Sequence, residues 1–206
     1  MIDLKVIKAT PKTGNEYLSV CGQNISYRLI DFWKWSVSDI LSNATRGRFA
    51  EFIVGTAIGF NPNKLRDEWD AYDLTSEEGI KIEVKSAAYI QCWKQTKFSK
   101  ISFSIKASKY WSNELGEIDS NPKRHADLYV FCLLKHKEQE TIEPLNMDQW
   151  GFYVIPTYVL DNYKRSQTSI TLNSLRKLTD QVEYRNLRDC IQKVYLEQKN
   201  YTQHTV

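Results

Sequence analysis

The spacing of apolar side chains predicts helices in the first third of the chain. Over residues 31–59 apolar positions recur at intervals of three and four, which is typical of amphipathic helices. Residues that favour helix ends stand at suitable places in this stretch. The candidate N-caps are Ser36 or Ser38 for one helix and Asn43 or Thr45 for the next, with Gly59 as the stop. Before this stretch, residues 1–30 are expected to form short strands and turns, with turns at 13–16 and 21–24.

Strand patterns dominate the middle of the chain. Residues 69–74 and 80–90 are expected to form a hairpin around a polar turn, and residues 100–105 alternate in the manner of a further strand. The run at 126–134 is almost continuously apolar, which predicts a strand buried on both faces, and 150–156 is another strand. Residues 109–124 are predicted to be helix or loop.

Residues 157–206 are predicted to be short helices with a polar tail. The order of helices and strands favours an α/β fold with a mixed central β-sheet flanked by helices. A length of 206 residues suits a single domain, 1–206, with its core at about 31–156.

Composition narrows the class of protein. The hydrophobic share is 42% and the charged share 26%, which are ordinary for a globular chain and argue against disorder. A net charge of +3 permits nucleic-acid binding without requiring it. The four cysteines are widely spaced and form no CxxC pair, so reduced thiols in a cytoplasmic protein are expected. Residues 1–12 lack the apolar core of a signal peptide, and no apolar run is long enough to span a membrane.

Glu51 lies within a predicted helix whose surface is apolar on two sides. One predicted stripe consists of Phe49, Phe52, Ile53 and Thr56, and the stripe that contains Glu51 consists of Gly47, Val54, Gly55 and Ile58. A carboxylate among such neighbours is costly unless cations or donors meet it. Pairing with Arg46 or Arg48 would be a structural explanation, and a role in a site is the alternative. The two glycines favour the site slightly, because they let another backbone approach.

The stretch Ile80–Ala87 places a carboxylate and an amine on one face of a strand. Residues two apart point the same way, about 6.6 Å from each other, so Glu83 and Lys85 share a face that Gln91 joins if the strand continues. The hairpin brings Asp73 alongside, with Asp70 as a competing candidate. Alternating charges on a strand are most often a solvated face, and a short ExK motif arises by chance in many proteins. The nearby Asp73, Glu51 and Gln91 favour a site over that explanation.

Carboxylates are hard oxygen ligands that suit Mg²⁺ or Mn²⁺ rather than zinc. A metal held by a few carboxylates activates water and neutralises charge on a phosphate. Protonated Lys85 is no ligand, but it can orient the nucleophile or stabilise a pentacovalent phosphate, and a role as a base stays open.

These residues resemble the pattern of the PD-(D/E)xK nuclease superfamily, which has a restriction-endonuclease-like fold. In that pattern a helix Glu precedes a hairpin that carries an Asp and then the (D/E)xK pair, and Glu51, Asp73, Glu83 and Lys85 match in order. Tyr72 stands where the family name has Pro. The resemblance covers about residues 45–135.

The resemblance implies roles for each matched residue. It implies that Asp73 and Glu83 bind Mg²⁺ or Mn²⁺ with the Val84 carbonyl, and that Glu51 binds the metal directly or through water. It implies that Lys85 positions the attacking water and that Gln91 contacts the site or the nucleic-acid backbone.

The hypothesis that follows is a metal-dependent endonuclease that hydrolyses phosphodiester bonds of DNA, in a restriction, defence or repair setting. The alternative is a nuclease-like fold that only binds nucleic acid or a protein partner. Lys94, Lys97, Lys100, Lys106 and Lys109, interleaved with aromatic residues, are expected to contact nucleic acid as a region. No glycine-rich phosphate loop occurs, so no nucleotide cofactor is expected. Double-strand cutting by one active site would need a homodimer or two sequential nicks.

Overall fold

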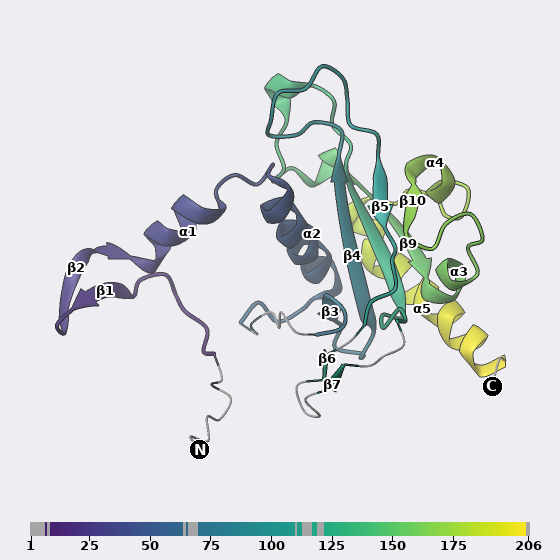
Figure 1. Ribbon diagram of the computed structural model, residues 1–206, viewed down its shortest axis with the longest axis horizontal. Helices are drawn as coiled ribbons and strands as arrows, with labels where there is room; N and C mark the ends of the chain where they lie inside the picture. The colour runs from purple at the N-terminus through teal and green to yellow at the C-terminus, as the bar shows by residue number, and fades with distance from the viewer. Residues whose placement is uncertain are drawn as a thin grey trace. The chain divides into compact units, whose positions relative to one another are not determined.

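A computed structural model describes residues 7, 9–63, 65, 70–109, 111–112, 117–118 and 122–204 (Figure 1). The chain divides into two compact units, Met1–Asp39 with Asn61–Asp67 and Ile40–Phe60 with Glu68–Val206. Each unit is described by itself below, as unit 1 and unit 2. The single domain expected from chain length stays a prediction.

Unit 1 contains a β-hairpin followed by a helix. Strands β1 (Tyr17–Val20) and β2 (Gln23–Arg28) pair antiparallel, and helix α1 (Leu29–Val37) follows β2 directly. The connection between the strands consists of Cys21 and Gly22, with φ of 48° and 77°. Two residues of positive φ are the geometry of a tight hairpin turn, so the turn predicted at 21–24 is confirmed.

The helices begin at other residues than the sequence pattern suggested. Helix α1 begins at Leu29, where the Arg28 amide donates to the Asp31 carboxylate at 2.8 Å, and Ser38 lies at its C-terminal end. The N-cap of α2 (Asn43–Ile58) is Ser42, whose hydroxyl accepts the Thr45 amide. The expected N-caps at Ser36 or Ser38 and at Asn43 or Thr45 are therefore wrong, because the first helix starts earlier and a preceding serine caps the second.

The predicted stop at Gly59 is confirmed. Gly59 has a φ of 73°, a left-handed conformation that glycine adopts without steric cost. Its amide donates to the carbonyl groups of Gly55 and Thr56, which closes the last turn of α2.

Unit 2 is built on a mixed four-stranded sheet in the order β3-β4-β8-β9. Its strands are β3 (Leu74–Thr75), β4 (Lys81–Ala88), β8 (Leu128–Leu134) and β9 (Trp150–Pro156). Strand β4 runs parallel to β8, while β3 is antiparallel to β4 and β9 is antiparallel to β8. Every residue of β8 and β9 is buried. The predicted α/β class with a mixed central sheet is thus confirmed, as is the burial of β8 on both faces.

Helices cover one face of this sheet and a mixed layer covers the other (Figure 1). The first face packs against α2 and α5 (Leu187–His204), through residues such as Ile53, Val54 and Ile191. The second face packs against α3 (Thr157–Asp161), α4 (Leu172–Leu175) and a small sheet of β5 (Ser102–Ser104) with β10 (Ser169–Thr171).

The buried face of α2 differs from the predicted stripe. The buried apolar residues are Ala50, Ile53, Val54 and Ile58, whereas Phe52 and Thr56 are exposed. Gly55 does not admit another backbone, because a Cβ there would lie 3.0 Å from the Phe60 ring, and a Cβ at Gly47 would meet nothing. The buried face of the helix thus combines Ile53 of the first predicted stripe with Val54 and Ile58 of the second.

The remaining elements correct two expectations. Two short paired strands, β6 (Trp111–Ser112) and β7 (Glu117–Ile118), lie where helix or loop was expected, and Tyr110 and several neighbours are outside the described residues. The expected polar tail is instead α5, a helix of 18 residues whose Leu187, Ile191 and Val194 are buried.

Three single 3₁₀ turns occupy Gln139–Thr141, Met147–Gln149 and Tyr184–Asn186. None of the helices in the described part of the chain combines the length and apolar character needed to cross a bilayer.

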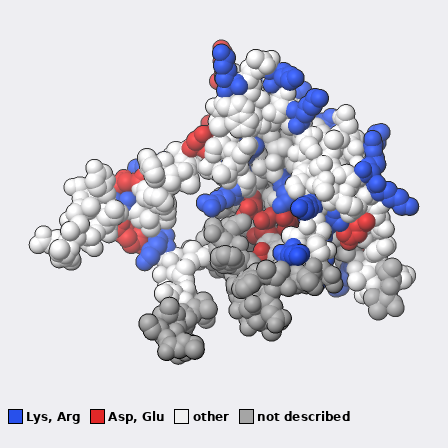
Figure 2. Space-filling view, in the orientation of Figure 1, with Lys and Arg blue, Asp and Glu red and all other residues white. Residues whose placement is uncertain are grey.

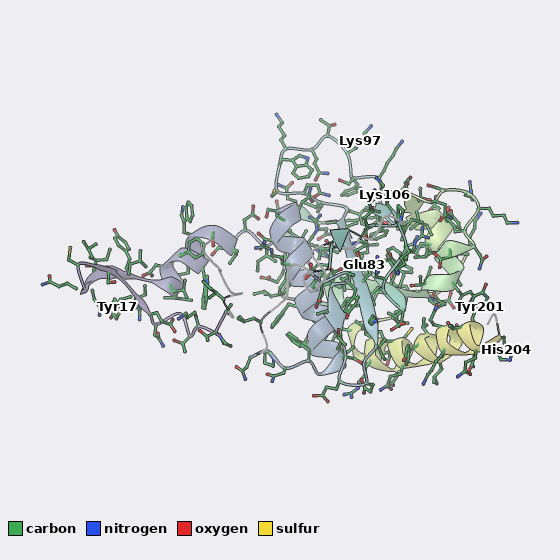
Figure 3. All side chains as sticks on the ribbon, turned by 60° about the horizontal axis from the view of Figure 1, so that its bottom comes forward. Tyr17, Glu83, Lys97, Lys106, Tyr201 and His204 are labelled. Carbon is green, nitrogen blue, oxygen red and sulfur yellow. The ribbon has the colours of Figure 1, made fainter. Side chains whose placement is uncertain are left out.

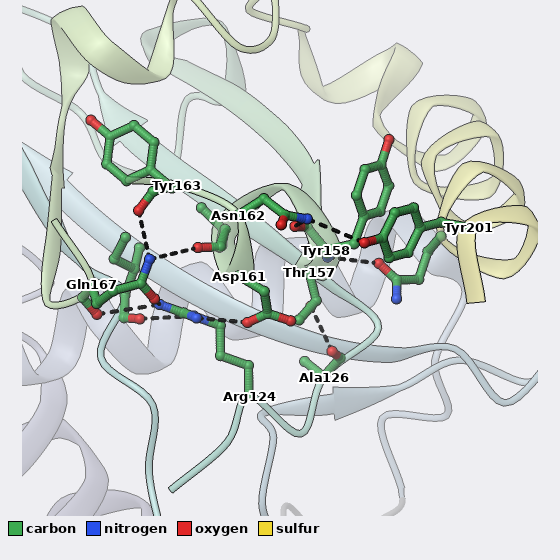
Figure 4. A network of polar contacts seen from close by, with 12 residues as sticks. Arg124, Ala126, Thr157, Tyr158, Asp161, Asn162, Tyr163, Gln167 and Tyr201 are labelled. Carbon is green, nitrogen blue, oxygen red and sulfur yellow. Dashed lines mark hydrogen bonds and ion pairs between the residues drawn. The ribbon is translucent and has the colours of Figure 1, made fainter. Parts of the chain in front are cut away.

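A buried arginine fastens the second face of the sheet (Figure 4). The side chain of Arg124 is 3% exposed and forms an ion pair with Asp161 at 2.7 Å. Its remaining donors reach the Ile105 carbonyl and the backbone and side-chain oxygens of Gln167. One guanidinium thereby joins three segments that are far apart in the sequence.

Replacing this arginine is expected to destabilise the fold. Arg124→Ala removes a side chain that is almost fully buried and leaves the Ile105 carbonyl and the exposed Asp161 carboxylate without their charged donor, which should lower the free energy of unfolding by about 2 kcal/mol. Urea denaturation measures the change. Arg185→Ala is the matched control, since Arg185 and Glu183 form an exposed pair and should contribute less than about 0.5 kcal/mol. Equal losses in the two variants would contradict the structural role given to Arg124.

Candidate functional site

The site begins at the hairpin of β3 and β4, where the pairing stops after two residues. Leu74 pairs with Ile82 and Thr75 with Lys81, and the Asp73 amide then donates to the Ile82 carbonyl at 3.1 Å. The Asp73 carboxylate replaces the next backbone partner, because its Oδ2 accepts the Val84 amide at 2.7 Å. Short strand pairing therefore fixes Asp73 at the edge of the sheet, beside the middle of β4.

Glu83, which Figure 3 labels, and Lys85 lie on the face of β4 opposite to Ile82 and Val84. Ile82 and Val84 are buried against the helix-covered face, so the alternation of a strand directs Glu83 and Lys85 to the opposite face. The Lys85 ammonium forms an ion pair with Glu83 Oε1. The two side chains are 29% and 19% exposed, so the pair is partly shielded from water but open to a ligand.

The poorly solvated carboxylate of Glu83 dominates the electrostatics of the site. Burial, followed by the like charge of Asp73, raises the pKa of Glu83, while Lys85 lowers it and Glu51 raises it. The charges of Asp73 and Glu51 thus both act on the Glu83 carboxyl, which is paired with the Lys85 ammonium. Figure 2 shows a group of Asp and Glu side chains near the centre of unit 2 with Lys and Arg around it.

Glu51 lies on helix α2, which packs against the same face of the sheet as Ile82 and Val84. Its side chain is half-buried, and its charge is one of those that raise the pKa of Glu83. Asp70, the competing candidate for the place of Asp73, is exposed. The structure therefore brings Asp73 to β4 beside Glu83 and Lys85, in agreement with the spacing of Asp73 to Glu83, while the Glu51 charge acts on Glu83 from helix α2. Their catalytic roles stay predictions.

Gln91 is not placed with the carboxylates. Its amide nitrogen donates to the Ala88 carbonyl at 2.8 Å and to the Ser99 hydroxyl at 3.1 Å, and its amide oxygen accepts from Arg46 at 3.1 Å. Ala88 is five residues beyond Glu83, about 16 Å along an extended strand. The hydrogen bonds of Gln91 hold the loop that follows β4, and its predicted contact with the site or nucleic acid stays a prediction.

The donor atoms at the sheet edge suit a hard divalent cation. Asp73 and Glu83 supply carboxylate oxygens, and the Val84 carbonyl lies on the same edge of β4 as its amide. The excess of carboxylates over ammonium groups is a charge that Mg²⁺ or Mn²⁺ would neutralise. Mg²⁺ is commonly held by one or two carboxylates together with water and substrate phosphate. Among the described residues no three His, Cys, Asp or Glu side chains are grouped closely enough to hold a metal by themselves.

Two residues of this region have neighbours that the sequence did not predict. Tyr129 is the cross-strand partner of Glu83 on β8 and is 4% exposed. Burial, followed by the charge of Glu83, raises the pKa of its phenol, which keeps Tyr129 protonated. Arg46 is buried and bonds Leu41, Asn43 and Gln91. Tyr129 is the one residue with a polar tip in the run of Leu128–Leu134, but its position opposite Glu83 depends on a register that the sequence does not reveal.

The sheet edge and its carboxylates beside a lysine define the class as an α/β protein with a carboxylate–lysine site. A model of the bacteriophage T4 endonuclease IV family matches residues 24–174, well over half of the chain. The chain therefore belongs to this endonuclease family. The matched range includes Glu51, Asp73, Glu83 and Lys85 and ends before α5. A comparison with curated proteins found no match.

The raised pKa of Glu83 predicts a pH-dependent gain in stability on its removal. Below the ordinary pKa of 4.5, Glu83 is protonated in both the folded and the unfolded state and carries no penalty. As the pH rises through the elevated pKa of the folded state, ionisation of the buried carboxyl destabilises the fold. Glu83→Gln removes this charge and keeps an oxygen acceptor for Lys85. Its melting temperature should exceed that of the wild type at neutral pH, and the difference should shrink towards pH 4.

Thermal unfolding followed by circular dichroism, without divalent cations, measures this difference across the pH range. Glu140→Gln is the control for the loss of one negative charge, because Glu140 is exposed in a 3₁₀ turn away from the sheet edge. A Glu83→Gln variant that is less stable than the wild type at neutral pH would show that its ion pair with Lys85 outweighs the cost of burial.

Proposed function

We propose that this protein is a metal-dependent endonuclease that hydrolyses phosphodiester bonds of DNA at the edge of strand β4. The observation that carries the proposal is the placement of Asp73 beside β4, where Glu83 forms an ion pair with the Lys85 ammonium. Membership of the bacteriophage T4 endonuclease IV family supports the reaction class. A restriction, defence or repair setting is part of the proposal and rests on analogy of fold.

The order of the site elements also supports a restriction-endonuclease-like fold of the PD-(D/E)xK type. A helix that carries Glu51 comes first, a hairpin with Asp73 at its first strand follows, and Glu83 and Lys85 are on the second strand. The strand that carries Glu83 then pairs parallel with a buried strand. This arrangement agrees with the resemblance that the motif itself suggested.

Asp73 and Glu83 would hold Mg²⁺ or Mn²⁺ with the Val84 carbonyl, and Glu51 would bind it directly or through water. The metal would supply Lewis-acid stabilisation of the phosphate and a more acidic water. Asp73 is suited to its place because one of its oxygens is already fixed by the Val84 amide. Glu83 is suited because its half-buried carboxylate gains from any cation that relieves its repulsion with Asp73.

Lys85 positions the reacting groups. An ammonium has three donors, and Glu83 accepts one of them, so the ion pair fixes the direction of the lysine side chain. From this position Lys85 donates to the attacking water and to the phosphate oxygens as negative charge develops on them. Tyr129, the cross-strand neighbour of Glu83, is a neutral side chain next to these charged groups.

Removal of the site residues is expected to abolish cleavage without loss of fold. Lys85→Met and Glu83→Gln should each lower kcat by about 10²-fold or more, since each removes a group that acts on the reacting phosphate. The assay compares single-stranded, duplex and supercoiled DNA with RNA, with Mg²⁺ or Mn²⁺ and with EDTA. Cleavage should require the metal and should disappear with EDTA.

Glu140→Gln and Lys193→Gln are the matched controls, since both remove exposed charges outside the site and should cut as the wild type does. Wild-type rates in both site variants would refute the assignment. Calorimetric titration with Mn²⁺ separates the proposal from a fold that only binds nucleic acid or a protein. If neither the wild type nor Glu83→Gln shows a heat of binding for Mn²⁺, the result would favour the alternative, a fold that only binds nucleic acid or a protein.

A further inference from the structure

The chain that leaves the site strand is strongly and uniformly basic. Between Glu83 and Glu114 there is no Asp or Glu, and this stretch contains six lysines. These are Lys85, Lys94, Lys97, Lys100, Lys106 and Lys109. Three of them, at 94, 97 and 100, lie in the loop between β4 and β5, residues 89–101, which is called the lysine loop below. All three are exposed.

Side-chain hydrogen bonds give the lysine loop a fixed shape. The Gln95 side chain accepts the Gln91 amide at 2.7 Å and donates to the Tyr89 carbonyl and to the Ser99 hydroxyl. The Ser99 amide closes the loop by donating to the Tyr89 carbonyl at 3.0 Å. Gln91 then ties the loop to buried Arg46 on helix α2. The loop therefore presents its lysines without first having to be ordered by a ligand.

Aromatic side chains stand between these cations. Trp93 is 52% exposed and Phe98 is 50% exposed, and both line a surface pocket formed by Trp93–Lys100. From the segment after β8, the Lys137 ammonium lies 4.5 Å from the Tyr89 ring centroid and 5.6 Å from that of Phe98. Lys137 thus adds a fourth cation to the same surface, held over rings rather than neutralised by a carboxylate.

The lysine loop follows the strand that carries the site. It leaves the end of β4 about 16 Å beyond Glu83, measured along the strand. Figure 2 shows Lys and Arg side chains over the loop at the end of β4, and Figure 3 labels Lys97 at this loop and Glu83 nearer the middle of unit 2. A nucleic acid whose scissile phosphate is at Glu83 would reach the loop within a few nucleotides.

We propose that the lysine loop, with Lys137, is a docking surface for the phosphate backbone of the nucleic-acid substrate outside the cleaved bond. The proposal rests on the proposed function for the class of substrate, and it assigns the loop to binding rather than to chemistry. Lysines neutralise phosphates and release condensed counterions, which makes binding depend steeply on salt. The fixed loop and its unbroken positive charge suit a long polyanion better than a small one.

The test compares two triple variants that lose the same charge. Lys94, Lys97 and Lys100 are replaced by Gln in one, and exposed Lys164, Lys193 and Lys199 are replaced by Gln in the control. Binding of a fluorescein-labelled DNA oligonucleotide is followed by anisotropy in EDTA, between about 50 and 200 mM salt. The loop variant should bind at least about tenfold more weakly, with a salt slope reduced by about 2 to 3, while the control keeps the wild-type slope.

Cleavage kinetics complete the test. With metal present, the loop variant should show a raised KM and a kcat within about threefold of the wild type, since its lysines do not touch the reacting phosphate. A wild-type protein that binds but does not cut would refute the proposed function and leave the docking surface intact. A loop variant with the salt slope of the control would overturn the docking surface. Lysine-dependent binding to phosphatidylserine vesicles in the absence of DNA binding would overturn it as well.

Discussion

The complete burial of strand β8 is the constraint on which the arrangement of unit 2 depends. All seven of its residues are inaccessible, β4 and β9 pair with its two edges, and packed layers cover its two faces. Polar chemistry therefore has no place at the centre of the sheet. The charged residues lie instead on β4. Its outer partner β3 consists of two residues, and next to them the Asp73 carboxylate accepts the Val84 amide in place of a backbone carbonyl.

A single sheet edge thereby serves opposing physical demands. Packing on one side requires Ile82 and Val84 to be apolar, while the other side gathers Glu83 and Lys85 in partial burial. The cost of burying Glu83 next to Asp73 is offset in part by Lys85, and a divalent cation would offset more of it.

The sequence predicted the parts of this picture that depend on local pattern. Alternation placed Glu83 and Lys85 on one face, and the apolar run predicted the buried β8. Features set by tertiary contacts were not readable in the same way. The buried face of α2 and the length of α5 follow from packing between distant segments. The neighbourhood of Tyr129 and Glu83 follows from a parallel register, and the bond from Arg46 to Gln91 spans 45 positions. Neither has a signature in a single sequence.

The shortness of β3 has a consequence for the behaviour of the molecule among its own copies. Beyond Ile82 the outer side of β4 has no partner strand among the described residues, and an open strand edge is a template for association with another chain. Here the Asp73 carboxylate accepts the hydrogen bond of the Val84 amide, and the partly exposed charged groups of Glu83 and Lys85 lie beside it. The same groups that are proposed to act on phosphate thus keep the edge from recruiting a further strand, so one set of side chains would serve both the proposed activity and resistance to aggregation.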